Sequence, residues 1–397
     1  MKVLFTHRYF VPDSPPYGLM LKILAQGIVE RDGYDVHVFS AMPSYRDELN
    51  GYVAKHEDVK GVTVRRCRVF GTEKAGAAIR VLNTIAYCVA MFMYVVKTRP
   101  DVVTAGTYPP VLAAWVASFA AKLVGARFIY HMQDIHPEVS QFSGGLLGKG
   151  LSKKLFLWLD AQTMCRTSAV VVLSEDMEAT LRARNIKLPP VYIINNPAIT
   201  TEESVEQPPE DYRKEKGKFR VIFAGNMGKF QNLSLLVDGV AECFEEFPEL
   251  ELIFLGDGVM KSELQSRWEK HTQVKFYPYL PYSQAKVLMQ ESDVGLVSLQ
   301  ENIYKVSYPS KVTTYLSLGL KILAIVEPCS RLAKDTETNS LGRVPGDLCS
   351  SSIALALKDM LQSREKSNCV RQWYEENCSH DVNLGSWLSL LTTSEKV

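Results

Sequence analysis

The stretch SYPSKVTTYLSLGLKILA, residues 307–324, decides how the second half of the chain folds. Its apolar residues first follow helical spacing, a glycine then ends the helix, and the run LKILA predicts a buried strand. Pro309 fixes φ before the helix, Ser310 is a residue type favoured as an N-cap, and Lys311 falls in the first turn. A lysine there opposes the helix dipole unless an anion compensates it, so we expect a bound phosphate.

Outward from this stretch, strand-like apolar runs alternate with helical stretches, which is the pattern of parallel α/β sheets. A polar, proline-bearing segment interrupts the alternation once. We therefore predict two Rossmann-like parallel-sheet domains that face a central cleft, with ligands bound where the strands end. The predicted parts are an N-terminal domain (1–198), a linker (199–218), a C-terminal domain (219–370) and a helical segment (371–397) that packs back on the N-terminal domain.

Composition places the chain among globular proteins. Its 397 residues are 46% hydrophobic and 22% charged, with a net charge of +1, so nothing suggests a nucleic-acid partner. The eight cysteines show no CxxC spacing, which favours reduced thiols over disulfides or a zinc site. The first ten residues, MKVLFTHRYF, predict a buried strand and not a signal peptide, and we expect a cytoplasmic protein.

One long apolar segment, residues 77–96, tests that expectation. It approaches the length needed to span a bilayer, but Arg80, Asn83 and Thr84 interrupt its first half. Three interpretations stay open. The segment is a helix buried in a large α/β domain, a helix that also rests on a membrane face, or a spanning helix.

Two further loops in the second half follow predicted strands and carry glycine with a cation. In FAGNMGKFQNL, Gly225 allows close approach of an anion and Lys229 adds positive charge. In FLGDGVMKSEL, Gly256 and Asp257 form a tight turn over which Lys261 could reach. Each loop alone is also compatible with an ordinary strand-to-helix turn, but three such strand ends in one domain together indicate an anion site.

The first domain offers a second group of candidates. Gly18 opens the first helix, and its backbone could approach a phosphate. The strand end HMQDIHPE supplies the candidate catalytic residues His131, Asp134, His136 and Glu138. Their spacing suits no common metal site, so we expect no metal.

Several catalytic motifs are missing from the sequence. The chain has no DxD, which argues against a nucleotide diphosphate held through Mg²⁺ by paired aspartates. A diphosphate would then be neutralised by helix N-termini and by Lys229, Lys261 and Lys311. Neither GxSxG nor GxxxxGK[ST] occurs, which disfavours serine hydrolysis and nucleotide hydrolysis.

In order and spacing, AGNMGKFQNL, FLGDGVMKSEL, ESDVGLVSL and YPSKVTTYLSLGLKILA resemble the C-terminal domain of family 4 GT-B glycosyltransferases. The bacterial branch that builds lipid-linked surface polysaccharides (O-antigen, capsule, exopolysaccharide) is the most similar. The first domain agrees in the order of its elements, so the resemblance covers essentially the whole chain.

The resemblance implies sugar transfer from a nucleotide-sugar, most often UDP-linked, with retention at the anomeric carbon and no metal or other cofactor. Backbone near Tyr279 would meet the base, and backbone from Ser307 to Ser310 the diphosphate. The candidate donor-binding residues are Gly18, Gly225, Asn226, Lys229, Gly256, Asp257, Lys261, Tyr279, Tyr308, Ser310, Lys311 and Thr314.

The chain departs from the family pattern at three places. Two glutamates that many members carry would fall on Val306 and Thr314, neither of which is acidic. An arginine and lysine pair in the first loop is replaced by Asn226 and Gln231. A histidine that often touches the donor sugar would fall near His131 or His136.

We predict a retaining, metal-independent glycosyltransferase that acts on a polyprenyl-diphosphate-linked acceptor. It would lie in the cytoplasm, peripheral to the inner face of the cell membrane. Two alternatives remain: a GT-B-like nucleotide-sugar epimerase, which would need Asp134 and Glu138 as acid and base, and a catalytically silent GT-B subunit that binds a partner enzyme.

Overall fold

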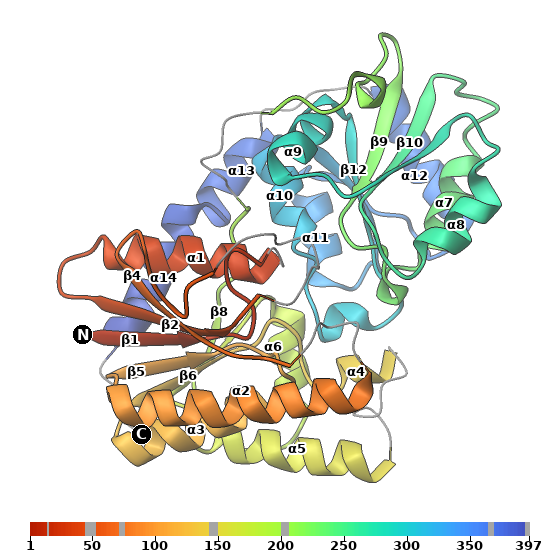
Figure 1. The fold of residues 1–397 in the computed structure, drawn as a ribbon. Helices are drawn as coiled ribbons and strands as arrows, with labels where there is room; N and C mark the ends of the chain where they lie inside the picture. Colours follow the sequence, from red (N-terminus) through yellow and green to blue (C-terminus); the bar gives the residue numbers. More distant parts are fainter. Residues whose placement is uncertain are drawn as a thin grey trace. The chain divides into compact units, whose positions relative to one another are not determined.

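The computed structural model describes residues 1–13, 16–43, 53–70, 76–142, 150–199, 206–363 and 369–393. These residues form two compact units (Figure 1). Unit 1 comprises Met1–Asn196, Val306–Tyr308 and His380–Val397, and unit 2 comprises Pro197–Lys305 and Pro309–Ser379. Residues 200–205 of the expected linker lie outside the described residues.

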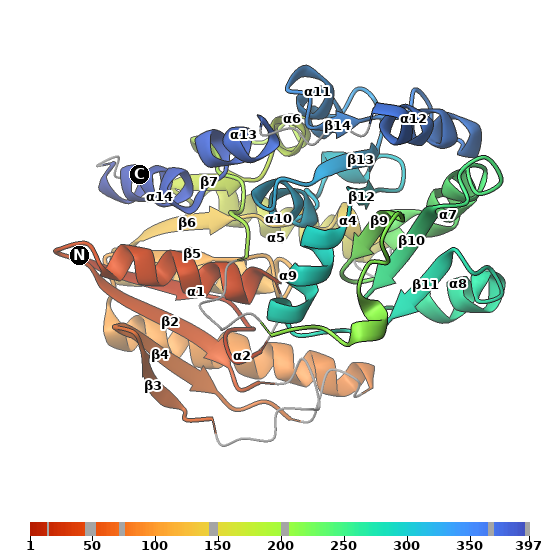
Figure 2. The ribbon, with the colours of Figure 1, turned by 90° about the horizontal axis from the view of Figure 1, so that it is seen from above.

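Unit 1 is built on an eight-stranded sheet in the order β3-β4-β2-β1-β5-β6-β7-β8, which can be followed in Figure 2. Its strands are β1 (Lys2–Thr6), β2 (Asp35–Ala41), β3 (His56–Val59), β4 (Val62–Cys67), β5 (Val102–Ala105), β6 (Arg127–His131), β7 (Ala169–Val172) and β8 (Val191–Ile193). All pairs are parallel except β3 with β4. The fully buried strands are the continuous apolar runs, such as AVVV of β7, as expected for a sheet covered on both faces.

Helices cover both faces of this sheet (Figure 1). The helices of unit 1 are α1 (Pro16–Val29), α2 (Ala77–Thr98), α3 (Leu112–Val124), α4 (Val139–Phe142), α5 (Gly150–Met164), α6 (Glu175–Arg182) and α14 (His380–Thr392). On one face α1 packs beside α14, whose Trp387 is buried in the core and meets the ring of Phe5 edge-on. On the other face α2 and α3 lie side by side, and α3 also contacts α5.

Among the described residues, α2 is the one helix long and apolar enough to cross a membrane, judged over Ala78–Thr98 by length and composition alone. Only 28% of its most apolar window is buried. Its inner side nevertheless belongs to the core of unit 1, because Tyr87, Met91 and Val95 are fully buried. The helix therefore lies along the sheet of unit 1.

Unit 2 has a six-stranded parallel sheet in the order β11-β10-β9-β12-β13-β14. Its strands are β9 (Phe219–Ala224), β10 (Leu250–Leu255), β11 (Val274–Tyr277), β12 (Val294–Ser298), β13 (Lys321–Ile325) and β14 (Gly342–Arg343). The stretch LKILA thus becomes β13, as the sequence predicts.

The α-helices of unit 2 are α7 (Leu233–Ala241), α8 (Lys261–Trp268), α9 (Tyr282–Glu291), α10 (Lys311–Ser317), α11 (Arg331–Thr338), α12 (Ser350–Ser363) and α13 (Cys369–Asn377). Short 3-10 turns occur at η2 (Glu210–Tyr212), η3 (Lys229–Gln231) and η4 (Ile303–Lys305). One core joins α7, α8 and α12 to alternate residues of β9, β10, β12 and β13. On the opposite face α9 contacts β9, and α10 contacts β12 and β13.

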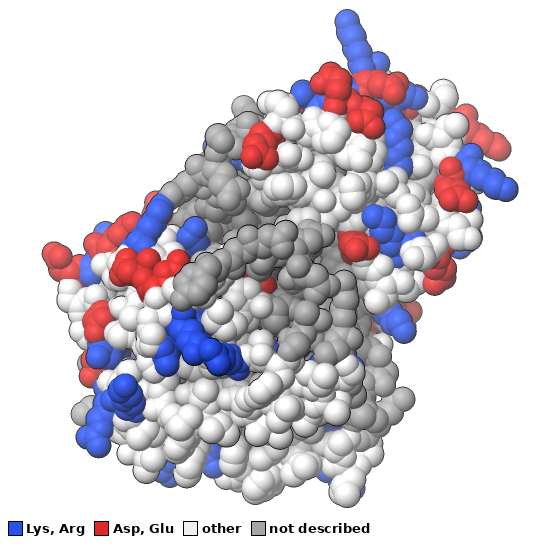
Figure 3. Space-filling view, viewed as in Figure 1, with Lys and Arg blue, Asp and Glu red and all other residues white. Residues whose placement is uncertain are grey.

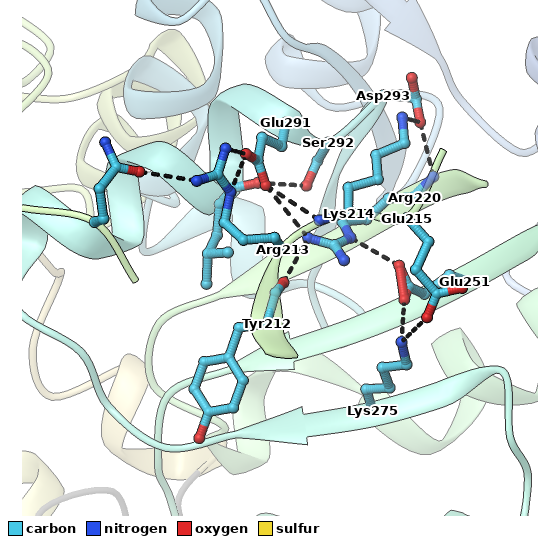
Figure 4. A network of polar contacts seen from close by, with 12 residues as sticks. Tyr212, Arg213, Lys214, Glu215, Arg220, Glu251, Lys275, Glu291, Ser292 and Asp293 are labelled. Carbon is cyan, nitrogen blue, oxygen red and sulfur yellow. Dashed lines mark hydrogen bonds and ion pairs between the residues drawn. The ribbon is translucent and has the colours of Figure 1, made fainter. Parts of the chain in front are cut away.

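A polar network ties the segment before β9 to unit 2 (Figure 4). Arg220 and Glu251 face each other in the register of β9 and β10, and Arg220 Nε donates to Glu251 Oε1 at 2.8 Å. Lys275 Nζ lies 2.7 Å from the other carboxylate oxygen. Burial raises the pKa of Glu251, but these two cations more than offset this and leave the pKa below its ordinary value. Lys214 pairs with Asp293 in the same network.

Candidate functional site

The stretch from Ser307 to Ala324 places Lys311 at the start of α10. Four residues later on the same helix, the Tyr315 hydroxyl accepts from Ala224 N at 2.8 Å and donates to Ile222 O at 3.2 Å. Gly295 of β12 makes room for this ring, since a Cβ there would lie 2.4 Å from it. Tyr315 thus fixes α10 against β9 and so positions Lys311 over the end of that strand.

The Lys311 ammonium lies 3.2 Å from the centroid of the Phe223 ring. Its Nζ is buried and has no hydrogen-bond partner among the described residues. Burial lowers the pKa of Lys311 well below its usual range. Burial without a counter-charge therefore disfavours the charged form of Lys311, and an anion beside Nζ would favour it.

Glycines shape the loops beside Lys311. Gly256 and Gly258 both have positive φ, and a Cβ on either would meet the neighbouring loop's backbone, at 2.2 Å from Gly225 O and 2.4 Å from Met227 O. Glycine is therefore required at both positions, because the two loops approach each other too closely for a Cβ. Gly225 differs, because its φ is +124° and the nearest atom to its missing Cβ is Lys311 Cε at 4.0 Å. The space in front of Gly225 is therefore open toward Lys311.

The two other candidate lysines have different surroundings. Lys261 Nζ donates to Gly256 O at 2.9 Å and to Tyr277 O at 3.3 Å, so it ties two strand ends together. Lys229 is exposed at the start of η3. Lys229 is thus available to a ligand, whereas Lys261 already has backbone partners.

The remaining candidates of the two loops are polar and exposed. Asn226 Nδ2 would lie 3.0 Å from a Cβ on Gly228, so it folds over its own loop. Asp257 Oδ1 accepts from Gly258 N at 2.9 Å, and its carbonyl accepts from Met227 N. These contacts hold the loops in shape and leave their outer surface polar.

The expectation that Ser310 caps α10 is wrong. Its backbone is already helical (φ −59°, ψ −21°), and its side chain makes no capping hydrogen bond within the described structure. The Ser310 carbonyl instead accepts from the Thr313 hydroxyl at 3.0 Å. Thr314, at the position expected for a glutamate, is buried in α10.

The aromatic candidates fall in different units. Tyr279 follows β11 in unit 2 and is 44% exposed. Tyr308 is half-buried and belongs to unit 1, whereas Pro309 and the residues after it belong to unit 2.

In unit 1, His131 stands at the end of β6 with a partner on each ring nitrogen. Nδ1 lies 2.8 Å from the Tyr17 hydroxyl, and Nε2 lies 2.7 Å from Gln133 Nε2. Burial lowers the pKa of His131 to about 3, so the ring is neutral near pH 7. The amide nitrogen of Gln133 can only donate, so we infer that Nε2 accepts and Nδ1 carries the hydrogen.

Sequence reasoning missed His7, which directly follows β1, at a position similar to that of His131 at the end of β6. The His7 ring packs edge-on against Tyr17 at 4.5 Å between centroids, and its buried Nδ1 has no partner among the described residues. Burial lowers its pKa to about 3. The shared signal is a histidine directly after a buried apolar strand, in LFTHR and in IYHMQ. Gly18 lies nearby in α1, where a Cβ would be 3.2 Å from Tyr9 O.

The other candidates of unit 1 are already engaged. Asp134 Oδ1 accepts from the Ser307 hydroxyl at 2.5 Å. His136 Nδ1 lies 3.2 Å from Ser140 Oγ, and burial lowers its pKa. Both side chains thus have hydrogen-bond partners within unit 1.

Glu138 belongs to a buried ionic cluster. Its two oxygens accept from Arg184 Nε at 2.8 Å and Nη2 at 2.5 Å. Arg184 also pairs with Asp160 of α5, which is fully buried and accepts from the Tyr130 hydroxyl at 3.1 Å. Burial raises the pKa of Asp160, and Arg184 partly opposes the rise. This arrangement favours an anchoring role for Glu138.

No group of three or more histidine, cysteine or acidic side chains is close enough to hold a metal ion within the described residues. A cavity of about 500 Å³ in unit 2 lies at the N-terminal ends of the strands, whereas Lys311 lies over the C-terminal end of β9. It is lined by the first residues of four strands, namely Phe219, Val294, Lys321 and Gly342. It is therefore separate from the surroundings of Lys311.

Comparison with known proteins agrees with this geometry. Residues 21–197 match the family described as glycosyl transferase 4-like domain. The putative colanic acid biosynthesis glycosyl transferase WcaI of Escherichia coli K12 is 24% identical over 360 residues, which cover 85% of this chain and 86% of that protein. The probable glycosyltransferase WbjE of Pseudomonas aeruginosa is 24% identical over 251 residues, 62% of each protein.

A solved structure extends the likeness in fold. Anabaena HepE in complex with UDP superimposes with a TM-score of 0.68 at 14% identity and covers 99% of this chain and 100% of its own. At that identity the likeness shows the fold alone, two parallel-sheet Rossmann-like units of the GT-B type. Together, the matched domain, the polysaccharide-synthesis relatives and the fold support a family 4 GT-B glycosyltransferase of the surface-polysaccharide type.

Proposed function

We propose that this glycosyltransferase moves a sugar from a UDP-sugar to a polyprenyl-diphosphate-linked saccharide, with retention and without a metal ion. One observation carries the proposal, the buried and unpartnered Nζ of Lys311 beside the open side of Gly225. A diphosphate would supply the counter-charge that this ammonium lacks, and the binding of UDP by HepE supports the choice of nucleotide.

The proposed chemistry needs little from a protein acid or base. The bond between the anomeric carbon and the phosphate oxygen breaks while the acceptor hydroxyl attacks from the same face. Because the new bond forms on the face that the leaving group vacates, the configuration is retained, and the departing phosphate oxygen takes the hydroxyl proton. Lys311, with Lys229 at the rim, would stabilise the negative charge that develops on the leaving group.

The state of the nominated carboxylates favours this reaction over epimerisation. An epimerase would need Asp134 and Glu138 as acid and base. Glu138 is instead held by two hydrogen bonds from Arg184, and Asp134 accepts from Ser307. Both carboxylates would have to leave these partners before they could transfer protons.

A silent partner subunit is disfavoured by Lys311 itself. Keeping a buried ammonium unpaired costs stability, and a chain without a donor would gain nothing from it. We therefore assign the unpaired lysine to substrate binding.

The test is a donor screen followed by an activity measurement. UDP-sugars and GDP-sugars are first compared by the thermal shift they cause, because a ligand bound to the folded state raises the midpoint. The selected donor is then incubated with and without lipid-linked acceptor, in the presence and absence of EDTA. Release of UDP only with acceptor, unaffected by EDTA, supports the proposal. Interconversion of sugars without acceptor would support the epimerase instead.

A further inference from the structure

The outer side of α2 is apolar and faces solvent. A stripe at every fourth position, each residue more than half exposed, consists of Val81, Ile85, Val89 and Met93. Leu82 and Ile79 extend this stripe toward the start of the helix. Soluble proteins rarely expose so continuous an apolar surface unless something covers it.

The neighbouring helices continue this surface. On α3, Phe119 and Leu123 are 46% and 61% exposed. The Phe119 ring stacks on Phe92 of α2 at 6.2 Å and on Trp115 at 6.3 Å between centroids, so the apolar surface runs from α2 onto α3. On α5, which contacts α3, the exposed side chains are Leu151, Leu155 and Trp158. We call these exposed side chains of α2, α3 and α5 the three-helix face.

The charges on these helices are almost all positive. They carry Arg80 and Lys97 on α2, Lys122 on α3, and Lys153 and Lys154 on α5. Their single acidic residue is Asp160, which is fully buried and paired with Arg184. The space-filling view shows the area over α2 white, with lysines and arginines at its margins and no acidic side chain (Figure 3).

We propose that the three-helix face docks on an anionic lipid bilayer. Apolar side chains with a bulky tryptophan suit the boundary between headgroups and acyl chains, and lysines and arginines around them suit anionic headgroups. The inference deepens the proposed function, on which it rests for its biological sense, because a lipid-linked acceptor is found in such a bilayer.

Docking on the bilayer accounts for the structure better than insertion across it. Asn83, on the inner side of α2, accepts from Phe70 N and donates to Phe70 O. Tyr94 bonds His37 of β2 at 3.1 Å. If α2 spanned the membrane, these contacts would break and the buried side chains of α2 would leave the core of unit 1. Docking instead brings only the exposed side of α2 into contact with lipid.

A second copy of the chain is a poor occupant. A two-fold contact would place the same patch on both partners, and so would bring the cations of one copy against those of the other. The three helices expose no acidic side chain to pair with them, so repulsion would oppose such a contact. A bilayer with anionic lipids has no such conflict.

The first experiment measures vesicle binding by flotation, with the full chain and vesicles of phosphatidylcholine alone or mixed with phosphatidylglycerol. The variant Ile85→Ser/Val89→Ser/Met93→Ser changes only exposed side chains, so its thermal midpoint should stay that of the wild type. We expect its partition onto the mixed vesicles to fall at least about tenfold. The matched control, Val259→Ser/Leu355→Ser, removes side chains of unit 2 that are 73% and 69% exposed, and should bind as the wild type does.

The second experiment reverses charge. Lys122→Glu/Lys153→Glu/Lys154→Glu should lower partition onto the mixed vesicles by at least roughly a hundredfold, since the loss of each cation near an anionic surface costs about fivefold and the added glutamates are repelled as well. Binding of the wild type to pure phosphatidylcholine should be weak, and added salt should weaken binding to the mixed vesicles.

Three outcomes would overturn the proposal. In the first, the variant Ile85→Ser/Val89→Ser/Met93→Ser binds vesicles as the wild type does. In the second, the control variant loses binding to the same extent. In the third, no vesicle binding is seen and the wild type forms a concentration-dependent dimer, which the triple-serine variant does not form. The UDP-induced thermal shift is measured on the same samples. If it is present without vesicle binding, docking fails alone, and if vesicles bind without it, the proposed donor is wrong.

Discussion

Buried polar side chains near the strand ends differ between the two units in whether they have partners. In unit 1, His131 has a partner on each nitrogen, and Arg184 is shared between Glu138 and Asp160. In unit 2, Lys311 is buried with no partner in the described structure. His7 Nδ1 is the exception in unit 1, because it is also buried without a partner among the described residues. His7 is neutral near pH 7, however, whereas Lys311 lacks a counter-charge for its ammonium form. The contrast supports the proposal that Lys311 binds the donor and that the paired groups of unit 1 stabilise the fold.

The largest effect is expected where a complete cluster is broken. Arg184→Met would leave Asp160 buried beside Glu138 without a cation, which should cost about 3 to 5 kcal/mol of unfolding free energy. Protonated Asp160 carries no charge, so the loss should shrink as the pH is lowered. Chemical denaturation of variant and wild type at several pH values measures this. A loss below about 1 kcal/mol would show that the cluster is not structural.

The next largest effect is expected at His131, a buried group that has partners but no charge. His131→Phe keeps a ring near Trp387 but leaves the Tyr17 hydroxyl without its partner, at a cost of about 1 to 3 kcal/mol. Adding Tyr17→Phe removes the hydroxyl that has lost its partner and should restore part of the stability. A double-mutant cycle measures the interaction energy between the two residues.

The same variant has a pH signature. The pKa of His131 is lowered to about 3 from 6.5, so the folded wild type binds fewer protons than the unfolded chain and loses stability as the pH falls through this range. The gap between wild type and His131→Phe should therefore narrow toward acid pH. A gap that is constant with pH would contradict a neutral, buried His131.

Substitution of Lys311 should change the unfolding free energy in the opposite direction. Lys311→Met removes an unpaired buried amine of similar length, and should raise the unfolding free energy of the ligand-free protein by about 1 kcal/mol. The folded pKa lies below the unfolded one, so the wild type gains stability as the pH rises and the gap should close in alkali. Denaturation curves across pH measure the gap. A destabilised Lys311→Met protein would mean that the lysine is structural.

Much of the fold could be predicted from the sequence. Apolar runs between glycines and prolines marked the buried strands, and the stretch from Ser307 to Ala324 became α10 and β13. The short antiparallel strand β3, HEDV, was missed, because its residues are polar and exposed and carry no period-2 apolar signal.

The site could be predicted only as far as residue type and strand position allow. Lys311 was expected in the first turn of a helix, where the structure places it, but its burial over Phe223 could not be predicted from the local sequence. The pairing of Glu138 with Arg184, forty-six residues away, depends on tertiary contact and leaves no trace in local sequence. Ser310 failed as a cap because α10 is pinned by Tyr315 and not by its N-terminal side chain.

The central claim is that Lys311 is reserved for the diphosphate of the donor, and UDP binding by isothermal titration calorimetry tests it most directly. Wild type is compared with Lys311→Met and with Lys270→Met, a control that removes an exposed lysine of unit 2 to which no role is assigned. We predict that Lys311→Met weakens UDP binding by about tenfold to a hundredfold. The wild type should take up a proton when UDP binds, seen as a binding enthalpy that depends on the ionisation enthalpy of the buffer. Lys311→Met should abolish this uptake, while Lys270→Met should bind UDP as the wild type does. Equal affinity of Lys311→Met and wild type would contradict the account.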